Sequence, residues 1–424
     1  MGAVPTRDDF ADRDARDPLA DFRARFDLPV GLIYLDGNSL GPLPAAAVAR
    51  VTGVMRDQWG RDLIKSWNDH DWINLPTRLG DKIARLIGAA AGEVVVADST
   101  SVNVFKMLAA ALPLRPDRPI ILSEERNFPT DLYVAQGLTG LLGHVGARAE
   151  LKLVADDGSR SASDQVIAAL DETVAVVMLT EVDFKTGERH DMARVTRAVH
   201  EAGALMLWDL CHSAGALAVD LNGCDADLAV GCGYKYLNGG PGAPAFLYVA
   251  KRLQDTIRPP LSGWMGHAAP FAFDLDYRPV DGIGRNLCGT PAILAQAVLE
   301  VGLDIMLDAD MAAIREKSIA LSDSFIARLE AVCGDDGFRL ISPRDPASRG
   351  SQVSFAHDHG YPIMQALIAH GVVGDFRAPD VLRFGFTPLY TRHVDIWDAV
   401  EILRDIMATR AWDDPVFHRR AQVT

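Results

Sequence analysis

The sequence predicts an α/β protein with a large domain on a seven-stranded, mostly parallel sheet and a smaller α+β domain at its C-terminal end. Two observations lead to this fold class. Short apolar runs alternate with amphipathic stretches through the first two thirds of the chain, which is typical of strand-helix-strand units. At 424 residues and 49% hydrophobic composition, the chain is also too long for a single core.

Seven apolar runs are predicted to form the strands of the large sheet. They are 94–96, 119–122, 151–154, 174–179, 204–208, 227–230 and 245–249. Apolar residues recur at helical spacing between these runs, which predicts helices over 102–112, 164–170 and 192–202. A polar N-terminal part with the short apolar run 31–35 precedes the first strand.

The pattern changes beyond Thr290-Pro291, where a long helical region extends to Val332. Short strands are predicted after it at 338–341, 352–355, 372–375 and 382–386, with helices between them. No repeat or Pro/Ser-rich linker separates the two parts. We therefore expect an N-terminal arm over 1–45, a large domain over 46–292 and a small domain over 293–424.

Charge and composition restrict the partners. A formal net charge of -15 argues against nucleic acid and anionic membranes, because binding either one needs clustered Lys and Arg. No apolar run approaches the ~20 residues of a membrane helix, and the opening residues are too polar for a secretory signal, so we expect a cytoplasmic protein. Five cysteines without a CxxC pair predict neither disulfides nor structural zinc, and we expect them reduced in the core. The histidines lack metal-ligand spacing, so no metal is expected.

Two charged residues follow neighbouring predicted strands. Asp209 ends the strand 204–208, and Lys235 follows the strand 227–230 within a segment rich in Gly and Tyr. Ligands of open α/β sheets bind at the carboxyl ends of strands. A carboxylate there can pair with a protonated pyridine nitrogen while a lysine amine forms a Schiff base, and this pair of roles is the one that pyridoxal phosphate requires. The alternative is that Asp209 caps a loop and Lys235 is a solvated surface lysine.

A phosphate site is predicted where the strand 94–96 turns into a helix. Helix N-termini offer free N–H groups, and the hydroxyls of Thr100 and Ser101 add donors. The alternative is an ordinary helix cap, which Ser and Thr also favour. The segment 211–215 resembles a nucleophile elbow but has Cys211 in place of the first Gly, and no phosphate-binding nucleotide motif follows a strand. A serine hydrolase and the nucleotide-binding folds are therefore disfavoured.

Six segments taken together resemble the kynureninase family, in the aspartate-aminotransferase group (fold type I) of pyridoxal-phosphate enzymes. They are 34–41, 98–103, 127–131, 208–215, 233–238 and 382–384. The segments Phe-Pro-Thr-Asp at 128–131 and Gly-Tyr-Lys-Tyr-Leu at 233–237 are specific in combination. The resemblance implies a fold type I pyridoxal-phosphate transferase-like fold and a pyridoxal 5'-phosphate cofactor.

The resemblance also implies roles for individual residues around the cofactor. Lys235 would hold it and move the substrate α-proton, and Asp209 would bind the pyridine nitrogen. Phe128 would stack on the ring, and Asp131 would reach a ring substituent or a neighbouring backbone group. Four more residues complete the cofactor site. Thr100 and Ser101 would hold the phosphate, His212 would lie at the phosphate or ring edge, and Thr180 would line the side of the ring opposite Phe128.

Further roles concern the substrate and a second subunit. Tyr234 would contact the phosphate or ring edge and deliver protons. Arg383 would hold the substrate α-carboxylate in a bidentate grip, and Trp67 and Asn68 would line the aryl pocket. Trp264 and Thr290 would reach the phosphate of the partner subunit in a homodimer with composite sites. Family members can carry Asn at the position of Thr290.

The resemblance implies hydrolysis of the Cβ–Cγ bond of L-kynurenine to anthranilate and L-alanine, in tryptophan degradation. With 3-hydroxy-L-kynurenine as an alternative substrate, the aromatic product would be 3-hydroxyanthranilate. The sequence leaves open which ring is preferred and whether the enzyme serves catabolism or NAD biosynthesis. Two other functions compete. One is a cysteine desulfurase, for which Cys288 or Cys333 would have to be a mobile acceptor; the other is a non-catalytic binding protein of the same fold.

Overall fold

The computed structural model describes residues 5–420 apart from 157 and 159. The chain divides into two compact units. Unit 1 comprises Met1–Ala46, Phe184–Arg189 and Asp308–Thr424, and unit 2 comprises Ala47–Asp183 and His190–Leu307. The N-terminal segment therefore belongs with the C-terminal part of the chain. A compact unit is not necessarily a domain that folds independently. The division into domains over 1–45, 46–292 and 293–424 therefore stays a prediction.

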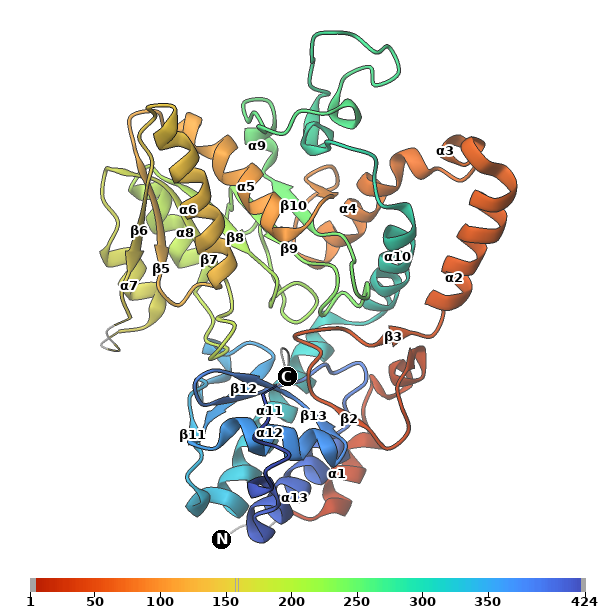
Figure 1. Cartoon of the computed structure of the whole chain (residues 1–424), viewed down its shortest axis with the longest axis vertical. Helices are drawn as coiled ribbons and strands as arrows, with labels where there is room; N and C mark the ends of the chain where they lie inside the picture. Colours follow the sequence, from red (N-terminus) through yellow and green to blue (C-terminus); the bar gives the residue numbers. More distant parts are fainter. Residues whose placement is uncertain (1–4, 157, 159, 421–424) are drawn as a thin grey trace. The chain divides into compact units, whose positions relative to one another are not determined.

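Unit 2 contains the large sheet (Figure 1). Its strands are β4 (Val94–Val96), β5 (Ile120–Glu124), β6 (Glu150–Val154), β7 (Val174–Thr180), β8 (Leu205–Asp209), β9 (Leu228–Gly231) and β10 (Phe246–Val249), in the spatial order β4-β10-β9-β8-β7-β5-β6. All seven strands lie at the predicted runs. The sheet is mostly parallel, as predicted, and β10 is antiparallel to both of its neighbours.

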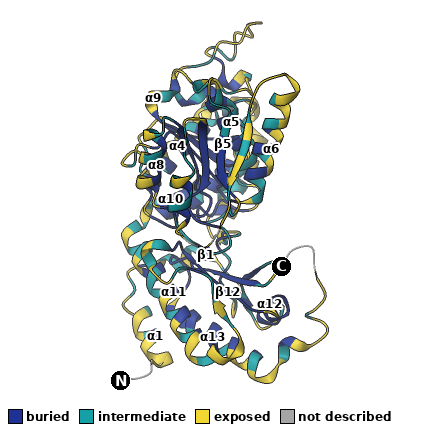
Figure 2. Ribbon diagram, turned by 90° about the vertical axis from the view of Figure 1, so that its left-hand side faces the viewer, coloured by how far each residue is buried: buried dark blue, intermediate teal, exposed yellow. Residues whose placement is uncertain are grey.

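Burial explains why these strands were visible in the sequence. Every residue of β7 and β8 is buried, because helices cover both faces of a parallel sheet and each strand then needs a continuous apolar run (Figure 2). The strand β6 forms one edge of the sheet, and all of its residues are half-buried or exposed.

The predicted helices of unit 2 appear as α5 (Thr100–Ala111), α7 (Ala162–Ala168) and α8 (Met192–Glu201). Two more helices bear on the site, α6 (Pro129–His144) and α10 (Ile293–Asp308). The sequence analysis did not predict the helical region before β4. It holds α2 (Ala47–Gly53), the π-helical turn η2 (Val54–Asp62), the short helices η3 (Leu63–Lys65), α3 (Ser66–Asp69) and η4 (Trp72–Asn74), and α4 (Leu75–Leu86). After β10 come α9 (Lys251–Gln254), η6 (Trp264–Gly266) and η7 (Gly282–Asn286).

Unit 1 is built on a four-stranded antiparallel sheet in the order β11-β12-β15-β14. Its strands are β11 (Arg339–Leu340), β12 (Gln352–Ala356), β14 (Asp375–Arg377) and β15 (Val381–Gly385), and β13 (Val372–Val373) pairs with β2 (Ile33–Tyr34). The predicted strand 372–375 is thus wrong as one strand, since it breaks at Gly374. A Cβ at Gly374 would lie 2.9 Å from the carbonyl oxygen of Arg383.

Three helices surround the core of unit 1: α11 (Met311–Cys333), α12 (Gly360–Ala369) and α13 (His393–Thr409). The predicted long helical region to Val332 is two helices, α10 and α11, and Asp310 caps the second one. The N-terminal α1 (Arg7–Asp14) buries Phe10 in the same core, and the 3-10 turn η1 (Ala20–Arg25) follows it.

The structure bears on the expected state of the cysteines and on the expected lack of a membrane helix. All five cysteines are free thiols, but only Cys211, Cys232 and Cys333 are buried. Cys224 and Cys288 are half-buried, because they lie in loops, so the expectation that all five belong to the core is wrong for these two. None of the helices that the structure describes has the length and hydropathy needed to cross a bilayer.

Candidate functional site

Three parallel strands of unit 2 end side by side at one edge of the sheet. Thr180 is the last residue of β7 and Asp209 the last of β8, and the two are cross-strand partners. Asp209 also pairs with Val230 of β9, and Lys235 follows four residues after the last residue of that strand, Gly231. The lysine and the aspartate therefore lie at the carboxyl ends of adjacent strands.

Two buried carboxyl groups lie together at this edge. Asp131, in the first turn of α6, hydrogen-bonds Asp209, and both residues are almost fully buried. Burial raises the pKa of Asp131 well above its ordinary value, and the nearby charge of Asp209 raises the pKa further. Within the described part of the chain, Oδ2 of Asp131 has no hydrogen-bond partner, and Oδ1 of Asp209 accepts from the backbone N–H of Cys211 at 2.8 Å. The pair is thus suited to a cation or a polar group that protein atoms do not supply.

Aromatic rings flank the half-buried Lys235. Its Nζ lies 6.0 Å from the ring centroid of Phe128 and 5.8 Å from that of Tyr234. Phe128 is 38% exposed, which leaves part of its ring uncovered beside the lysine. Burial raises the pKa of Tyr234, and the neighbouring Cys232 raises it further, so the phenol stays protonated at neutral pH.

Asn127 fixes the position of Phe128, and the sequence analysis did not assign it a role. Its Oδ1 accepts from the backbone N–H of Phe128 at 2.8 Å and from the hydroxyl of Thr180. Its Nδ2 donates to Oγ of Ser123 at 3.0 Å. The only signal in the sequence was its place next to the Phe-Pro pair.

The N-terminus of α5 is the predicted phosphate site. Thr100 and Ser101 are its first two residues and are half-buried, and the side chain of Ser99 caps the helix. Oγ1 of Thr100 lies 3.6 Å from Sγ of Cys211, which links this helix end to the loop after Asp209. The structure therefore brings Thr100 and the Asp209 loop together.

Lys106 holds the loop before this helix in place. Its side chain is fully buried, and its Nζ donates to Oδ2 of Asp98 at 2.7 Å and to the carbonyl of Asn286 at 2.6 Å. Asp98 has a φ of 51°, which is unusual for a residue with a side chain. A lysine inside an apolar helical pattern was the sequence signal for this contact, and the sequence analysis missed it.

The remaining predicted residues of unit 2 are less closely connected to Lys235. His212 is buried three residues after Asp209. Trp264 and Thr290 are exposed, and Trp264 packs edge-on against Phe271. In the short helix α3, Asn68 is exposed and Trp67 packs against Trp72 at 83°. Among the residues described, neither a hydrogen bond nor a ring contact joins Trp67, Asn68, Trp264 or Thr290 to Lys235.

Arg383 belongs to unit 1, on β15, and protein groups already bind its guanidinium. Its Nε donates to Oδ1 of Asp375 at 2.8 Å, and one terminal nitrogen donates to Oδ2 of the same carboxylate and to Oγ of Ser39. The other terminal nitrogen donates to the carbonyl of Phe184 at 2.6 Å. Four of the five N–H groups of an arginine are therefore engaged. Asp375 was not predicted, although it is the cross-strand partner of Arg383 on β14.

A second acid lies near this arginine. Burial and the nearby charge of Asp375 together raise the pKa of Asp36 to about 7. The nearby Arg383 and Arg377 partly oppose the shift. Arg377 donates to Asp375 at 2.7 Å, so one carboxylate binds both arginines.

The site in unit 2 fits pyridoxal phosphate on its own geometry. The acid pair Asp131 and Asp209 suits a protonated pyridine nitrogen and a neighbouring ring oxygen. The uncovered face of Phe128 suits the ring, Lys235 suits the aldehyde, and the N-terminus of α5 suits a phosphate.

Comparisons with known proteins agree with this site. Residues 314–403 match the family model described as Kynureninase C-terminal domain. The chain is 54% identical to a kynureninase of Burkholderia pseudomallei (strain 1106a) and 50% identical to one of Pseudomonas fluorescens. Each match covers 99% of this chain and 100% of the relative.

Solved structures confirm the fold. A cysteine desulfurase from Thermococcus onnurineus NA1 matches with a TM-score of 0.75 and 18% identity, over 96% of this chain and 100% of that chain. The cystine C-S lyase C-DES, in complex with cysteine persulfide, matches with a TM-score of 0.77 and 18% identity, over 89% of this chain and 98% of its own. At this identity the likeness concerns the fold, and it confirms the predicted fold type I class.

Proposed function

The chain belongs to the kynureninase family, and from that membership and the site around Lys235 we propose that it hydrolyses the Cβ–Cγ bond of L-kynurenine. The products are anthranilate and L-alanine. The observation that carries the proposal is the lysine beside a buried acid pair, at the carboxyl ends of adjacent parallel strands.

Pyridoxal phosphate, when bound, supplies an electron sink for the substrate α-carbon. Lys235 holds it covalently, and Asp209 accepts a hydrogen bond from its pyridinium nitrogen. Asp131 shares the proton of the acid pair and faces the ring substituents. Phe128 stacks on the ring, with its position set by Asn127.

Three side chains are proposed for the phosphate. Thr100 and Ser101 donate their hydroxyls beside the free N–H groups of α5, and His212 lies at the phosphate or ring edge. The hydroxyl of Thr180 is committed to Asn127, so Thr180 contributes its methyl surface to the other side of the ring.

The proton movements fall to Lys235 and Tyr234. The amine of Lys235 would remove the substrate α-proton. A water molecule adds its oxygen to the γ-carbonyl carbon, the Cβ–Cγ bond breaks, Cβ takes up a proton, and the amine of Lys235 returns a proton to the α-carbon. The phenol of Tyr234 delivers the proton to Cβ, because its ring lies beside the amine of Lys235.

Arg383 is proposed to bind the substrate α-carboxylate, and Trp67 and Asn68 to line the aryl pocket. Asp375 and Ser39 already fix the guanidinium plane of Arg383. The guanidinium of Arg383 therefore needs no reorientation when the substrate binds. Its one remaining N–H and its positive charge are what bind the carboxylate.

An anthranilate fluorescence assay tests the reaction. The holoenzyme is given L-kynurenine and 3-hydroxy-L-kynurenine separately, and we expect turnover with at least one of them. The ratio of the two kcat/KM values then gives the ring preference. No product from either substrate would exclude the proposed function.

The same preparation given L-cysteine tests for a cysteine desulfurase. We expect no sulfide, because Cys333 is buried in the last turn of α11 and cannot act as a mobile acceptor. Cys288 is half-buried, and its thiol lies 3.9 Å from the carbonyl of Ser262.

We also propose that the reaction belongs to tryptophan degradation and takes place in the cytoplasm.

We further propose that the enzyme is a homodimer in which Trp264 and Thr290 reach the phosphate of the partner subunit. The segment that follows Trp264 exposes large apolar side chains, among them Phe271, Phe273 at 77% and Leu275 at 103%. Exposed apolar surface of this kind favours burial against another protein. A two-fold dimer would cover it on both copies.

Subunit mixing tests the dimer. Lys235→Ala and the double variant Trp264→Ala/Thr290→Ala are each expected to be nearly inactive alone. When they are unfolded, mixed and refolded together, activity returns to roughly a quarter of wild type, because half of the dimers are mixed and each has one intact site of two. If mixing restores nothing, each subunit builds its site alone and the cross-subunit roles are wrong.

A further inference from the structure

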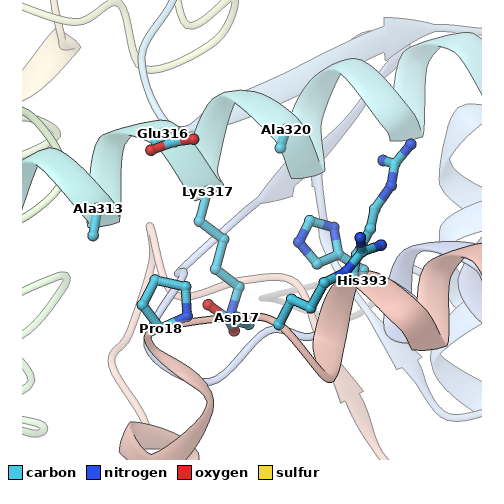
Figure 3. A pocket seen from close by; sticks show the side chains of 9 residues that line it. Asp17, Pro18, Ala313, Glu316, Lys317, Ala320 and His393 are labelled. Atoms are coloured by element: carbon cyan, nitrogen blue, oxygen red, sulfur yellow. The ribbon is translucent and has the colours of Figure 1, made fainter.

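Unit 1 contains a pocket of about 270 Å³ (Figure 3). The end of α1 with the turn that follows it, one face of α11 and the first residue of α13 form its walls. The α11 residues are 313, 316, 317 and 320, which is the spacing of one helix face. None of the residues proposed for the reaction lines this pocket.

A buried ion pair forms one wall of the pocket. Lys317 reaches from α11 to Asp17, and its Nζ lies 2.6 Å from Oδ2 of Asp17 (Figure 3). The same Nζ donates to the carbonyl of Pro388 at 2.6 Å, and the side chain of Lys317 is only 7% exposed. An ammonium group has three donors, so one N–H of Lys317 remains beyond these two bonds.

A buried histidine beside this pair also has spare hydrogen-bonding capacity. His393 is 6% exposed, and its Nδ1 has no partner among residues 5–420 as far as these are described. Its backbone N–H donates to the carboxylate of Asp14, which also accepts from the backbone N–H of Val394. Burial lowers the pKa of His393, and Lys317 and Arg13 lower it further, against the opposing charges of Asp14 and Asp17. The ring is therefore neutral at pH 7 and can donate one hydrogen bond.

Basic side chains outnumber acidic ones in the lining of the pocket, and the carboxylate of Asp14 lies just behind the lining, on the backbone N–H of His393. Arg13, Arg16 and Lys317 face two carboxylates, Asp17 and Glu316. Asp17 is committed to Lys317, and Glu316 is exposed. Arg13 donates one N–H to Ser324, and Arg16 donates its Nε to the carbonyl of residue 12. The other N–H groups of both guanidinium groups stay available at the pocket mouth.

We propose that this pocket is a second ligand site, which binds a small organic molecule through a carboxylate or phosphate group. Arg13 and Arg16 bind the oxyanion at the mouth, where a planar fork suits two oxygen atoms. Lys317 and the neutral ring of His393 donate the remaining hydrogen bonds from the wall. The volume is close to the lower end of ordinary small-molecule sites. The proposal does not depend on the reaction proposed above.

Titration calorimetry on the holoenzyme tests the site, since bound cofactor then occupies the phosphate site at α5. Citrate and inorganic phosphate are titrated separately at constant ionic strength, with sodium chloride as the balancing salt. We expect saturable binding of one anion per chain for at least one of the two. Tighter binding of citrate identifies a carboxylate ligand, and tighter binding of phosphate identifies a phosphate ligand.

The matched variants are Arg13→Gln/Arg16→Gln and, as control, Arg404→Gln/Arg410→Gln, which removes two exposed arginines of the same unit outside the pocket. All four side chains are exposed, so we expect both proteins to fold and to keep kcat/KM for kynurenine. The first variant should weaken anion binding about tenfold, and the control should not. Equal affinities in the two variants, or no saturable binding in wild type, would overturn the proposal.

A second readout reports the pocket wall directly. Histidine-labelled holoenzyme is followed by NMR during the citrate and phosphate titrations, and His393→Gln identifies the His393 signal among the 11 histidines. We expect that signal to move with the same midpoint as the calorimetric titration. Saturable heat with an unchanged His393 signal would show that the anion binds elsewhere, and the pocket assignment would be wrong.

Discussion

The charged groups around Lys235 and those around Arg383 are satisfied in different ways. In unit 2 two buried carboxyl groups, Asp131 and Asp209, hydrogen-bond each other, and one oxygen of Asp131 has no partner in the described chain. In unit 1 Asp375, Ser39 and a backbone carbonyl bind nearly all of the guanidinium of Arg383. The first group is incomplete without a bound molecule, whereas the protein completes most of the second. A cofactor that stays bound can supply the positive charge that Asp131 and Asp209 lack. A substrate leaves in every cycle, so its carboxylate binds more favourably to a side chain that needs no reorientation.

The largest effect is expected from Lys235→Ala, which removes the residue that both holds the cofactor and moves the proton. Turnover of kynurenine should fall by at least about a thousandfold with an unchanged circular dichroism spectrum. Lys251→Ala, at the surface lysine that begins α9, is the control and should keep full activity. Hydride reduction of the wild-type holoenzyme should attach the cofactor to Lys235. Attachment at any other lysine contradicts the mechanism at its first step.

Arg383→Ala should reduce kcat/KM about a hundredfold, since a charge-assisted pair with this buried guanidinium contributes roughly 3 kcal/mol. Cofactor affinity, measured by absorbance, should change far less. Arg383→Lys should restore little, because lysine lacks the planar fork that Asp375 and Ser39 hold. A variant with nearly normal kcat/KM would show that another residue binds the carboxylate.

Asp131→Asn tests whether the acid pair of unit 2 is incomplete without the cofactor. The folded-state pKa of Asp131 is raised, so its stabilising contribution is complete below the ordinary aspartate pKa of about 4 and is lost as pH rises toward the raised value. Urea unfolding of the apoprotein should show this decline in wild type and a flatter profile in the variant. The variant should be more stable by about 2 kcal/mol at pH 8. Equal pH profiles would mean that the pair is already satisfied by protein groups.

Asp36→Asn should have the smallest effect, because the nearby charges of Arg383 and Arg377 partly offset the cost of ionising Asp36. Its pKa is raised to about 7, so its stabilising contribution is lost between about pH 4 and pH 7 as the group ionises. The variant should unfold about 2–3 °C higher than wild type at pH 8 and at the same temperature as wild type near pH 4. A difference that grows toward low pH would have the wrong sign and would contradict the raised pKa.

Local pattern was enough to locate the seven strands of the unit 2 sheet, with ends that lie within two residues of the predicted ones. Strands buried on both faces, such as β7 and β8, must be continuous apolar runs, and Asp209 ends one of these runs while Lys235 follows the next one. The pattern was weaker over 47–74, where short helices and a π-helical turn follow one another, but α4 was missed although its buried Leu75, Leu79 and Ile83 recur at helical spacing. It also failed at Gly374, which interrupts an otherwise apolar strand.

Only the tertiary structure decided which side chains meet. Asp131 and Asp209 lie 78 positions apart in the chain, and no periodicity shows that the two carboxyl groups will meet. The register of β14 and β15 sets Asp375 against Arg383, and the packing of α1 against α13 assigns the N-terminal segment to unit 1. The pocket at Lys317 likewise combines three segments that are distant in sequence. Periodicity follows from the environment of each residue along one element, whereas these contacts depend on how separate elements pack, and that packing is a property of the folded chain as a whole.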